Sequence, residues 1–228
     1  MVPLQDLEDY YFKAKLVLDY EWSAADKVAK KFGLNVISTQ GTTRAVFKEP
    51  YKRDVIKLGF PTHNRGEYVF SKYVKGTKHS HLFAETREIT PQGYFTRQEF
   101  VRKSLPQVIC FLSDKNWYKF REILESCFSF VRLAVGNAGV TFDFHDENFK
   151  VSSDGNLKLV DYSDLACSMF CKDYNLKPET AVNRLKRVDI PPRDLNLTYS
   201  KDYGIRLAIN DTTYHLPSLE DQSNETFL

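Results

Sequence analysis

The chain has 228 residues, a formal net charge of +2 and a hydrophobic content of 42%, which is enough for one or two packed cores. Near-neutral charge excludes a general nucleic-acid-binding surface, and 14% aromatic residues exclude a disordered chain. No apolar run reaches about eighteen residues and MVPLQDLEDYY is no signal peptide, so neither a membrane span nor secretion is expected. Four cysteines without zinc-binding spacing suit free thiols in a reducing cytoplasm.

The first third of the chain favours helices followed by a strand pair. Residues 5–17 are expected to form a helix, and a second helix is expected from Ser23 as N-cap to its end at Gly33. Residues 36–47 then predict strand, glycine turn, strand. Gly41, among small hydroxyl residues, could let backbone N–H groups approach a phosphate, although most such turns simply connect strands.

Residues 54–60 form a short apolar strand that contains one lysine, Lys57. A lysine on a buried strand face is costly unless it is paired, for example with a phosphate group. The strand taken alone favours the alternative, a lysine that snorkels from an edge strand. Glu67 opens a predicted helix at 66–73. It can either pair with Lys57 or form a capping box with Asn64 as N-cap, and the sequence leaves both open.

Residues 94–100 predict a further strand, and an apolar stripe predicts a long helix from about 116 to 135, capped by Ser113 or Asp114 and ended by Gly136. This helix leads into TFDFHDEN. Beyond residue 164 the pattern is less informative. It favours a helix or compact loop at 165–174, a helix from 177 to about 187, and a hairpin of 205–209 with 212–216.

Asp143, Asn148 and Asp161 have the spacing that phosphoryl transfer needs: one carboxylate to accept a hydroxyl proton, and an amide oxygen with a second carboxylate to hold Mg²⁺. Strands at 149–151 and 157–160, joined by a turn at 153–156, predict a hairpin that brings Asn148 and Asp161 together. Asp and Asn are also ordinary turn residues, so the triplet by itself is compatible with a plain turn.

Taken in order, the stretches GTTRAVFKEP, VIKLGF and FDFHDEN…VDYSD resemble the protein-kinase-like fold. They are most similar to the early serine/threonine protein kinases of short-tailed bacteriophages that encode their own RNA polymerase. The resemblance implies that Gly41 lies in the nucleotide loop and that Lys57, paired with Glu67, grips the phosphates of ATP. It further implies that Asp143 is the catalytic aspartate, while Asn148 and Asp161 bind Mg²⁺.

The resemblance also implies the architecture, an α+β fold with two lobes. Residues 1–33 would be an N-terminal helical extension, 34–100 a small N-lobe with an antiparallel sheet, 101–216 a reduced and mainly helical C-lobe, and 217–228 a polar tail, all within one kinase-like domain of residues 1–228. The adenine would contact the backbone near 99–102, a placement that rests on fold analogy.

Several positions depart from the kinase pattern. Thr141 replaces the histidine of the H-R-D motif, and Tyr162 and Ser163 replace the Phe-Gly of D-F-G. No A-P-E follows. Eukaryotic-type protein kinases have lysine at the position of His145. A histidine at this position is similar to aminoglycoside phosphotransferases and to the phage kinases. These departures put a regulated activation loop in doubt.

The resemblance implies a phage-type kinase that transfers the γ-phosphate of ATP to Ser/Thr hydroxyls of host proteins in the host bacterial cytoplasm, with no direct contact to nucleic acid or membrane. Two alternatives remain open: a small-molecule kinase of the aminoglycoside-phosphotransferase type, and a kinase-fold binding protein that inhibits a host factor by contact. The sequence does not indicate an oligomeric state.

Overall fold

The computed structural model describes residues 1–18, 23–38, 44–77, 80–104, 114–127, 148–153, 155–162, 195–200, 204–209 and 212–216. These residues fall into two compact units, each of which is described by itself. Unit 1 contains the described residues of 1–76 and 84–100, and unit 2 contains those of 77–83, 101–162 and 195–216. Helices and antiparallel sheets occur in the chain, so it belongs to the α+β class.

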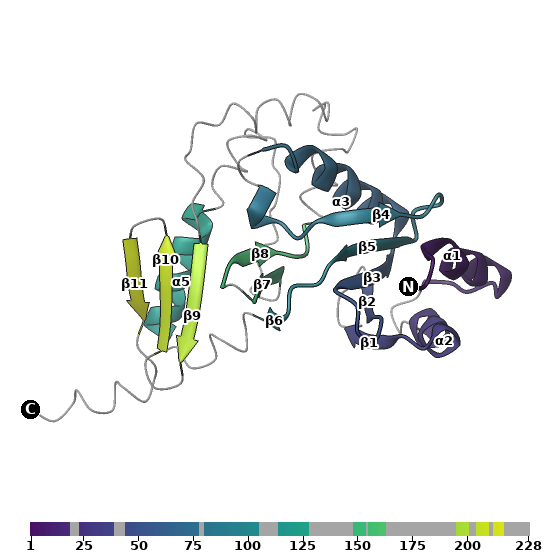
Figure 1. The fold of residues 1–228 in the computed structure, drawn as a ribbon, viewed down its shortest axis with the longest axis horizontal. Helices are drawn as coiled ribbons and strands as arrows, with labels where there is room; N and C mark the ends of the chain where they lie inside the picture. The colour runs from purple at the N-terminus through teal and green to yellow at the C-terminus, as the bar shows by residue number, and fades with distance from the viewer. Residues whose placement is uncertain are drawn as a thin grey trace, which may run out of the picture. The chain divides into compact units, whose positions relative to one another are not determined.

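Unit 1 is built on a five-stranded antiparallel sheet with the strand order β1-β2-β3-β5-β4 (Figure 1). Its strands are β1 (Asn35–Ser38), β2 (Arg44–Lys48), β3 (Asp54–Gly59), β4 (Thr86–Ile89) and β5 (Phe95–Glu99). The strands predicted within 36–47, at 54–60 and at 94–100 are therefore confirmed. The short edge strand β4 was not predicted.

Two N-terminal helices, α1 (Leu4–Lys13) and α2 (Ser23–Phe32), belong to unit 1. The predicted end of α2 is confirmed: Gly33 has a φ of +64° and the Leu34 N–H donates to the Ala29 carbonyl at 3.0 Å. This is a Schellman ending, which favours glycine because residues with a Cβ rarely adopt a left-handed backbone.

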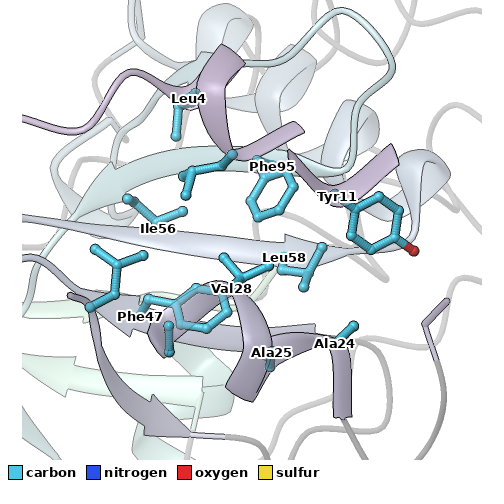
Figure 2. Close-up of a cluster of buried hydrophobic side chains, with 13 residues drawn as sticks. Leu4, Tyr11, Ala24, Ala25, Val28, Phe47, Ile56, Leu58 and Phe95 are labelled. Carbon is cyan, nitrogen blue, oxygen red and sulfur yellow. The ribbon is translucent and has the colours of Figure 1, made fainter. Parts of the chain in front are cut away.

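The main core of unit 1 lies between these helices and one face of the sheet (Figure 2). Opposite residues of antiparallel strands share a face. Phe47 therefore lies beside Ile56, and Leu58 beside Phe95. Each such side chain contributes roughly 1.5–3 kcal/mol when fully buried. From the helices come Leu4, Leu7, Tyr11, Ala24, Ala25, Val28 and Ala29.

Helix α3 (Pro61–Val74) connects β3 to β4 and contacts β4 and β5. The prediction that it begins at residue 66 was wrong. The helix starts directly after β3 because Pro61 occupies its first turn, where a missing N–H costs nothing. Phe60 is the N-cap, so Asn64 lies inside the helix, where its side-chain amide donates to the carbonyl oxygens of Gly93 and Tyr94 at 2.9 Å.

Unit 2 contains the predicted hairpin as β7 (Phe149–Val151) and β8 (Leu157–Leu159), in a sheet of order β6-β7-β8 with β6 (Lys103–Ser104). Gly155 has a φ of +86°, and its N–H donates to the Ser152 carbonyl at 3.0 Å. This closes the turn that the sequence predicted. The short 3₁₀ helix η1 (Ser80–Leu82) leads into Phe83, which forms a parallel bridge with Leu159.

The second sheet of unit 2 has the order β11-β10-β9, with β9 (Leu195–Ser200), β10 (Gly204–Ile209) and β11 (Thr212–Leu216). The strands of the predicted C-terminal hairpin are confirmed, whereas β9 was not predicted. Helix α5 (Asp114–Cys127) confirms the start of the long helix. Residues 128–147 and 163–194 lie outside the described residues, and with them the predicted end of that helix and the helices predicted after residue 164. The prediction of a mainly helical C-lobe therefore rests largely on residues that are not described, while the described residues of 101–216 form one helix and six strands.

Within the described residues of the whole chain, no helix combines the length and the apolar character that crossing a membrane requires.

Candidate functional site

Glu67, a fully buried carboxylate on α3, lies at the centre of the candidate site. Two cationic side chains from the sheet contact it. Arg44 Nη1 lies 2.6 Å from Glu67 Oε2. Lys57 Nζ lies 3.0 Å from Oε1 and 3.3 Å from Oε2. Both cations are almost completely buried, at 3% and 4% exposure. We refer to Arg44, Lys57 and Glu67 as the buried charge triad.

Two neutral donors complete the surroundings of Glu67. Thr86 Oγ1 donates to Oε1 at 3.1 Å, and Gln98 Nε2 donates to the same oxygen at 2.9 Å. Gln98 Nε2 also lies 3.1 Å from Thr86 Oγ1. Since an ionised carboxylate offers about four acceptor sites, these contacts occupy both oxygens of Glu67 and fix the position of its side chain.

The sheet register explains why these residues meet. Lys57 lies opposite Val46 on β2, and Arg44 is two residues before Val46, so both cations point from the same face. On the other side of β3, Gln98 lies opposite Val55 and also opposite Thr86 of β4. Because α3 follows β3 without a long loop, its second turn brings Glu67 over this face.

The buried charge triad has two positive charges and one negative charge. Burial of charge is expensive unless each charge is paired, and a buried ion pair usually stabilises a fold no more than a well-packed apolar set would. A contribution to the stability of the fold is therefore a weak explanation for the buried charge triad. Arginine and lysine side chains are also the residues that bind an anion such as a phosphate group.

The structure decides between the alternatives that the sequence left open for Lys57 and Glu67. Lys57 does not snorkel from an edge, because β3 is flanked by β2 and β5 and the side chain is buried. Glu67 does not form a capping box, because α3 begins six residues earlier at Pro61. The predicted pairing of these two residues is present. The contact of Lys57 with a nucleotide stays a prediction.

In unit 2, Asn148 and Asp161 flank the hairpin β7–β8 at its open end. The Val160 N–H donates to the Asn148 carbonyl at 2.8 Å, so the two chain ends are held together where the predicted metal ligands lie. Both side chains are half-buried. The next residue, Tyr162, is buried, and its ring meets that of Phe83 edge-on at 5.5 Å between centroids. Amide and carboxylate oxygens are the donors that Mg²⁺ prefers.

Gly41, Asp143 and His145 lie outside the described residues, so their roles stay predictions. Among the residues that the structure describes, no group of three or more His, Cys, Asp or Glu side chains is placed to hold a metal ion.

Arg44 is the member of the buried charge triad that sequence reasoning missed. It stands in the stretch GTTRAVFKEP, where it reads as a polar residue at the start of a strand. Its partner is 23 positions away in the chain. The signal that could have found it is the strand register, which places it on the same face as Lys57 once β2 and β3 are paired.

Comparisons with known proteins add little. No family model and no curated protein matches the chain. Among solved structures, the choline kinase LicA from Streptococcus pneumoniae is similar with a TM-score of 0.33 and 13% sequence identity, over 73% of this chain and 81% of that chain. A similarity of this size establishes neither a shared fold nor a shared substrate.

Proposed function

We propose that the chain is an ATP-dependent phosphotransferase with a protein-kinase-like fold that phosphorylates Ser or Thr hydroxyls of proteins. The observation that carries this proposal is the buried pair of Lys57 on β3 and Glu67 on α3, the helix that follows β3. Protein kinases use a lysine on their third strand, paired with a glutamate of the next helix, to hold the nucleotide phosphates.

Two further observations support the proposal. The strand containing Lys57 follows the pair β1–β2, whose connection contains Gly41, so the chain order is that of a kinase nucleotide loop followed by its lysine. The buried charge triad also contains an arginine and a lysine, the side chains that bind phosphate groups in proteins. Replacement of the whole triad by apolar residues of similar volume would be tolerated by stability, so the presence of these charges favours a role in recognition.

The chemistry follows from these residues. Lys57 binds the phosphates and Glu67 orients Lys57. Asn148 and Asp161 would hold Mg²⁺, for which their oxygen donors and shared position at the open end of the hairpin are suitable. The ion would neutralise charge on the phosphates when bound. Asp143 would accept the proton of the acceptor hydroxyl, and positioning with charge stabilisation supplies most of the rate.

The choice of protein hydroxyls as acceptors comes from the resemblance to phage kinases, which also proposes host proteins in the bacterial cytoplasm as substrates. His145 motivates the small-molecule alternative, and the missing Phe-Gly and A-P-E elements motivate the binding-protein alternative. An intact set of Lys57, Asp143, Asn148 and Asp161 argues against a pure binder, which has no chemical need for all four.

The test is to incubate the purified chain with Mg²⁺ and γ-labelled ATP in bacterial lysate, with an aminoglycoside added in a parallel sample. We expect labelled phosphoserine or phosphothreonine in proteins. Asp143→Asn should lower turnover by about 10²- to 10⁴-fold while sparing ATP binding. Lys57→Ala should weaken Mg·ATP binding itself. The matched control is Lys72→Ala, which removes an exposed lysine from the helix that holds Glu67.

Each outcome has a distinct meaning. Label on the aminoglycoside and none on protein would replace the protein acceptor by a small molecule. Mg·ATP binding without any transfer would make the chain a kinase-fold binding protein. Failure of the chain to bind Mg·ATP, measured as the absence of thermal stabilisation at saturating nucleotide, would overturn the proposal as a whole.

A further inference from the structure

We propose that Glu8 of α1 is a positioning residue: through the turn between β4 and β5 it fixes the first turns of α3, and with them the place of Glu67 opposite Lys57. This inference rests on the proposed function, because it concerns the pair that would hold the nucleotide phosphates. It gives the N-terminal helix α1 a task in nucleotide binding in addition to covering the apolar core.

Glu8 is the charged member of the buried face of α1. Leu4, Leu7 and Tyr11 share this face and pack in the apolar core of unit 1. Glu8 is as deeply buried as they are, with 1% exposure. Burial of a carboxylate is costly unless it is hydrogen-bonded, so the explanation for Glu8 lies in the groups that it binds.

Those groups belong to the β4–β5 turn, residues 90–94, which lies beside α1 (Figure 1). The Thr90 hydroxyl donates to Glu8 Oε1, and the Tyr94 N–H donates to the same oxygen at 3.2 Å. The Gln92 N–H donates to Oε2 at 3.1 Å. Both carboxylate oxygens of Glu8 therefore bind the turn.

Helix α3 holds the same turn through its carbonyl groups. Asn64 Nδ2 donates to the carbonyl oxygens of Gly93 and Tyr94, each at 2.9 Å, and Arg65 Nη2 donates to that of Pro91 at 3.2 Å. The packing is close, because a Cβ added at Gly93 would lie 2.9 Å from Arg65 Nε. The turn and the first turns of α3 therefore move together.

Two peptide groups of the turn connect the two helices directly. In the peptide group between residues 91 and 92, the oxygen accepts from Arg65 and the N–H donates to Glu8. In the group between residues 93 and 94, the oxygen accepts from Asn64 and the N–H again donates to Glu8. A planar trans peptide directs its N–H and C=O to opposite sides, and a hydrogen bond at one end polarises the group and strengthens the bond at the other.

The place of Asn64 on α3 carries this connection to the candidate site. Asn64 and Glu67 are three residues apart and fully buried, so they share one face of the helix, about 4.5 Å apart along its axis. A shift or rotation of the first turns of α3 therefore displaces Glu67 relative to Lys57, whose Nζ lies 3.0 Å from its carboxylate. Glu8 acts on the pair without touching it.

The experiment compares Glu8→Gln with Glu49→Gln on the full chain. Glu49 is a matched control because it is also a buried carboxylate that binds a backbone N–H, that of Val2, and a side chain of β5, Arg97. Among the described residues it forms no hydrogen bond with the β4–β5 turn or with α3. Calorimetry measures the dissociation constants for Mg·ATP and for adenosine, which lacks phosphates.

We expect Glu8→Gln to weaken Mg·ATP binding by about fivefold, the size of effect that a residue coupled to a site from a distance has, and to leave adenosine binding unchanged. The KM for Mg·ATP should rise with little change in kcat, because the grip on the phosphates is altered and the transfer step is not. Glu49→Gln should lower thermal stability and change neither dissociation constant.

A second variant tests the connection through the turn. Arg65→Ala removes an exposed side chain that holds the other end of the 91–92 peptide group, so it should also weaken Mg·ATP binding, whereas Lys72→Ala on the same helix should not. Because Glu8 and Arg65 act on one turn, the losses of affinity should not add in the double variant. Additive losses would overturn the connection. Arg65→Ala also keeps the test available if Glu8→Gln does not fold.

The outcomes separate the inference from the proposed function. If the unaltered chain binds Mg·ATP and Lys57→Ala weakens it, but Glu8→Gln behaves like Glu49→Gln, the role of Glu8 is wrong and the proposed function stands. If Glu8→Gln weakens Mg·ATP and adenosine equally, Glu8 is merely structural. If the unaltered chain does not bind Mg·ATP, both proposals fall.

Discussion

On one face of the unit 1 sheet, Phe47, Ile56 and Leu58 pack among apolar residues of α1 and α2. On the other face of the same strands, Arg44 and Lys57 surround the carboxylate that α3 supplies. Alternation along β2 and β3 separates the two sets residue by residue. Both faces are buried, so exposure to water does not explain why one is apolar and the other charged.

The difference teaches what each face contributes. Apolar burial stabilises in proportion to the area removed from water, whereas a buried ion pair adds little beyond what apolar residues of similar volume would give. The apolar face is therefore sufficient to account for the stability of unit 1. The charged face needs a second explanation, and the proposed recognition of a phosphate would supply one.

The largest change in the free energy of unfolding is expected from a substitution on the apolar face. Phe47→Ala should lower the free energy of unfolding by about 4 kcal/mol, because it removes a fully buried ring and leaves a cavity. Urea denaturation measures the loss, and Val36→Ala on the exposed edge strand β1 is the control. The affinity of the folded fraction for Mg·ATP should not change. A parallel loss of affinity would mean that the two faces are not independent.

Glu67→Gln is the corresponding change on the charged face. It removes the carboxylate that contacts both Arg44 and Lys57, which should cost about 3 kcal/mol. Under the proposed function it should also abolish the ordering of Lys57 and with it the binding of Mg·ATP. Urea denaturation and calorimetry with Mg·ATP measure the two losses. Unlike Phe47→Ala, this variant should lose nucleotide affinity in its folded fraction.

Replacement of the whole buried charge triad by apolar residues separates its contribution to stability from its contribution to nucleotide binding. Arg44→Met, Lys57→Met and Glu67→Leu together should recover stability that Glu67→Gln loses, because the three charges of the triad are removed at the same time. Mg·ATP binding should stay absent. If the combined variant instead bound Mg·ATP normally, the charged face would have no part in nucleotide recognition.

Helix ends and tight turns depend on residues that are close together in the sequence, and the sequence predicted these features. Ser23 and Gly33 mark the ends of α2, and the glycine turn at Gly155 marks the hairpin β7–β8. The edge strand β4 escaped prediction because charged residues, Arg87 and Glu88, occupy its exposed centre and hide the apolar alternation. Its place is set by pairing with β5, which a local pattern does not contain.

The candidate site divides in the same way. The pairing of Lys57 with Glu67 was available from the order of motifs, because both belong to a recognisable strand–helix unit. The contact of Arg44 with Glu67 could not be predicted from the order of motifs, because it depends on the strand register and on the true start of α3 at Pro61. The apparent capping box misled because Asn64 and Glu67 have its spacing, although Asn64 in fact binds carbonyls of the β4–β5 turn.

A smaller, pH-dependent effect is expected beside the apolar face, where Glu49 accepts hydrogen bonds from the Val2 N–H and from Arg97. Burial raises the pKa of the Glu49 carboxyl, but those donors and the Arg97 charge outweigh it and lower the pKa below its ordinary value of 4.5. Because the folded-state pKa is depressed, this stabilisation is present above pH 4.5 and disappears as pH falls through the lower folded value.

Glu49→Gln should therefore lower the free energy of unfolding by about 2 kcal/mol at pH 7. The loss should not be larger, because Arg97 keeps its contacts with Glu88 and with the Val2 carbonyl. Below pH 4.5 the difference from the unaltered chain should shrink. Thermal unfolding across this range measures it. A difference that stays constant with pH would show that the ionised carboxylate is not what stabilises the N-terminal segment.

The smallest effect concerns the helices that cover the two faces. Gly33 ends α2 over the apolar face with a φ of +64°, and Gly76 follows α3 over the charged face without a left-handed backbone. A Cβ added at either glycine would meet no atom within 4 Å, so the two positions differ in backbone conformation rather than in space.

Gly33→Ala should thus cost about 1 kcal/mol, the strain of placing alanine in a left-handed conformation. Gly76→Ala should be neutral or stabilise slightly, because alanine restricts the unfolded chain without straining the folded one. Thermal unfolding of both variants gives the comparison. If Gly76→Ala cost as much as Gly33→Ala, the end of α3 would need its glycine for a reason other than φ. A reduced affinity for Mg·ATP in Gly76→Ala would then connect that end of the helix to the position of Glu67.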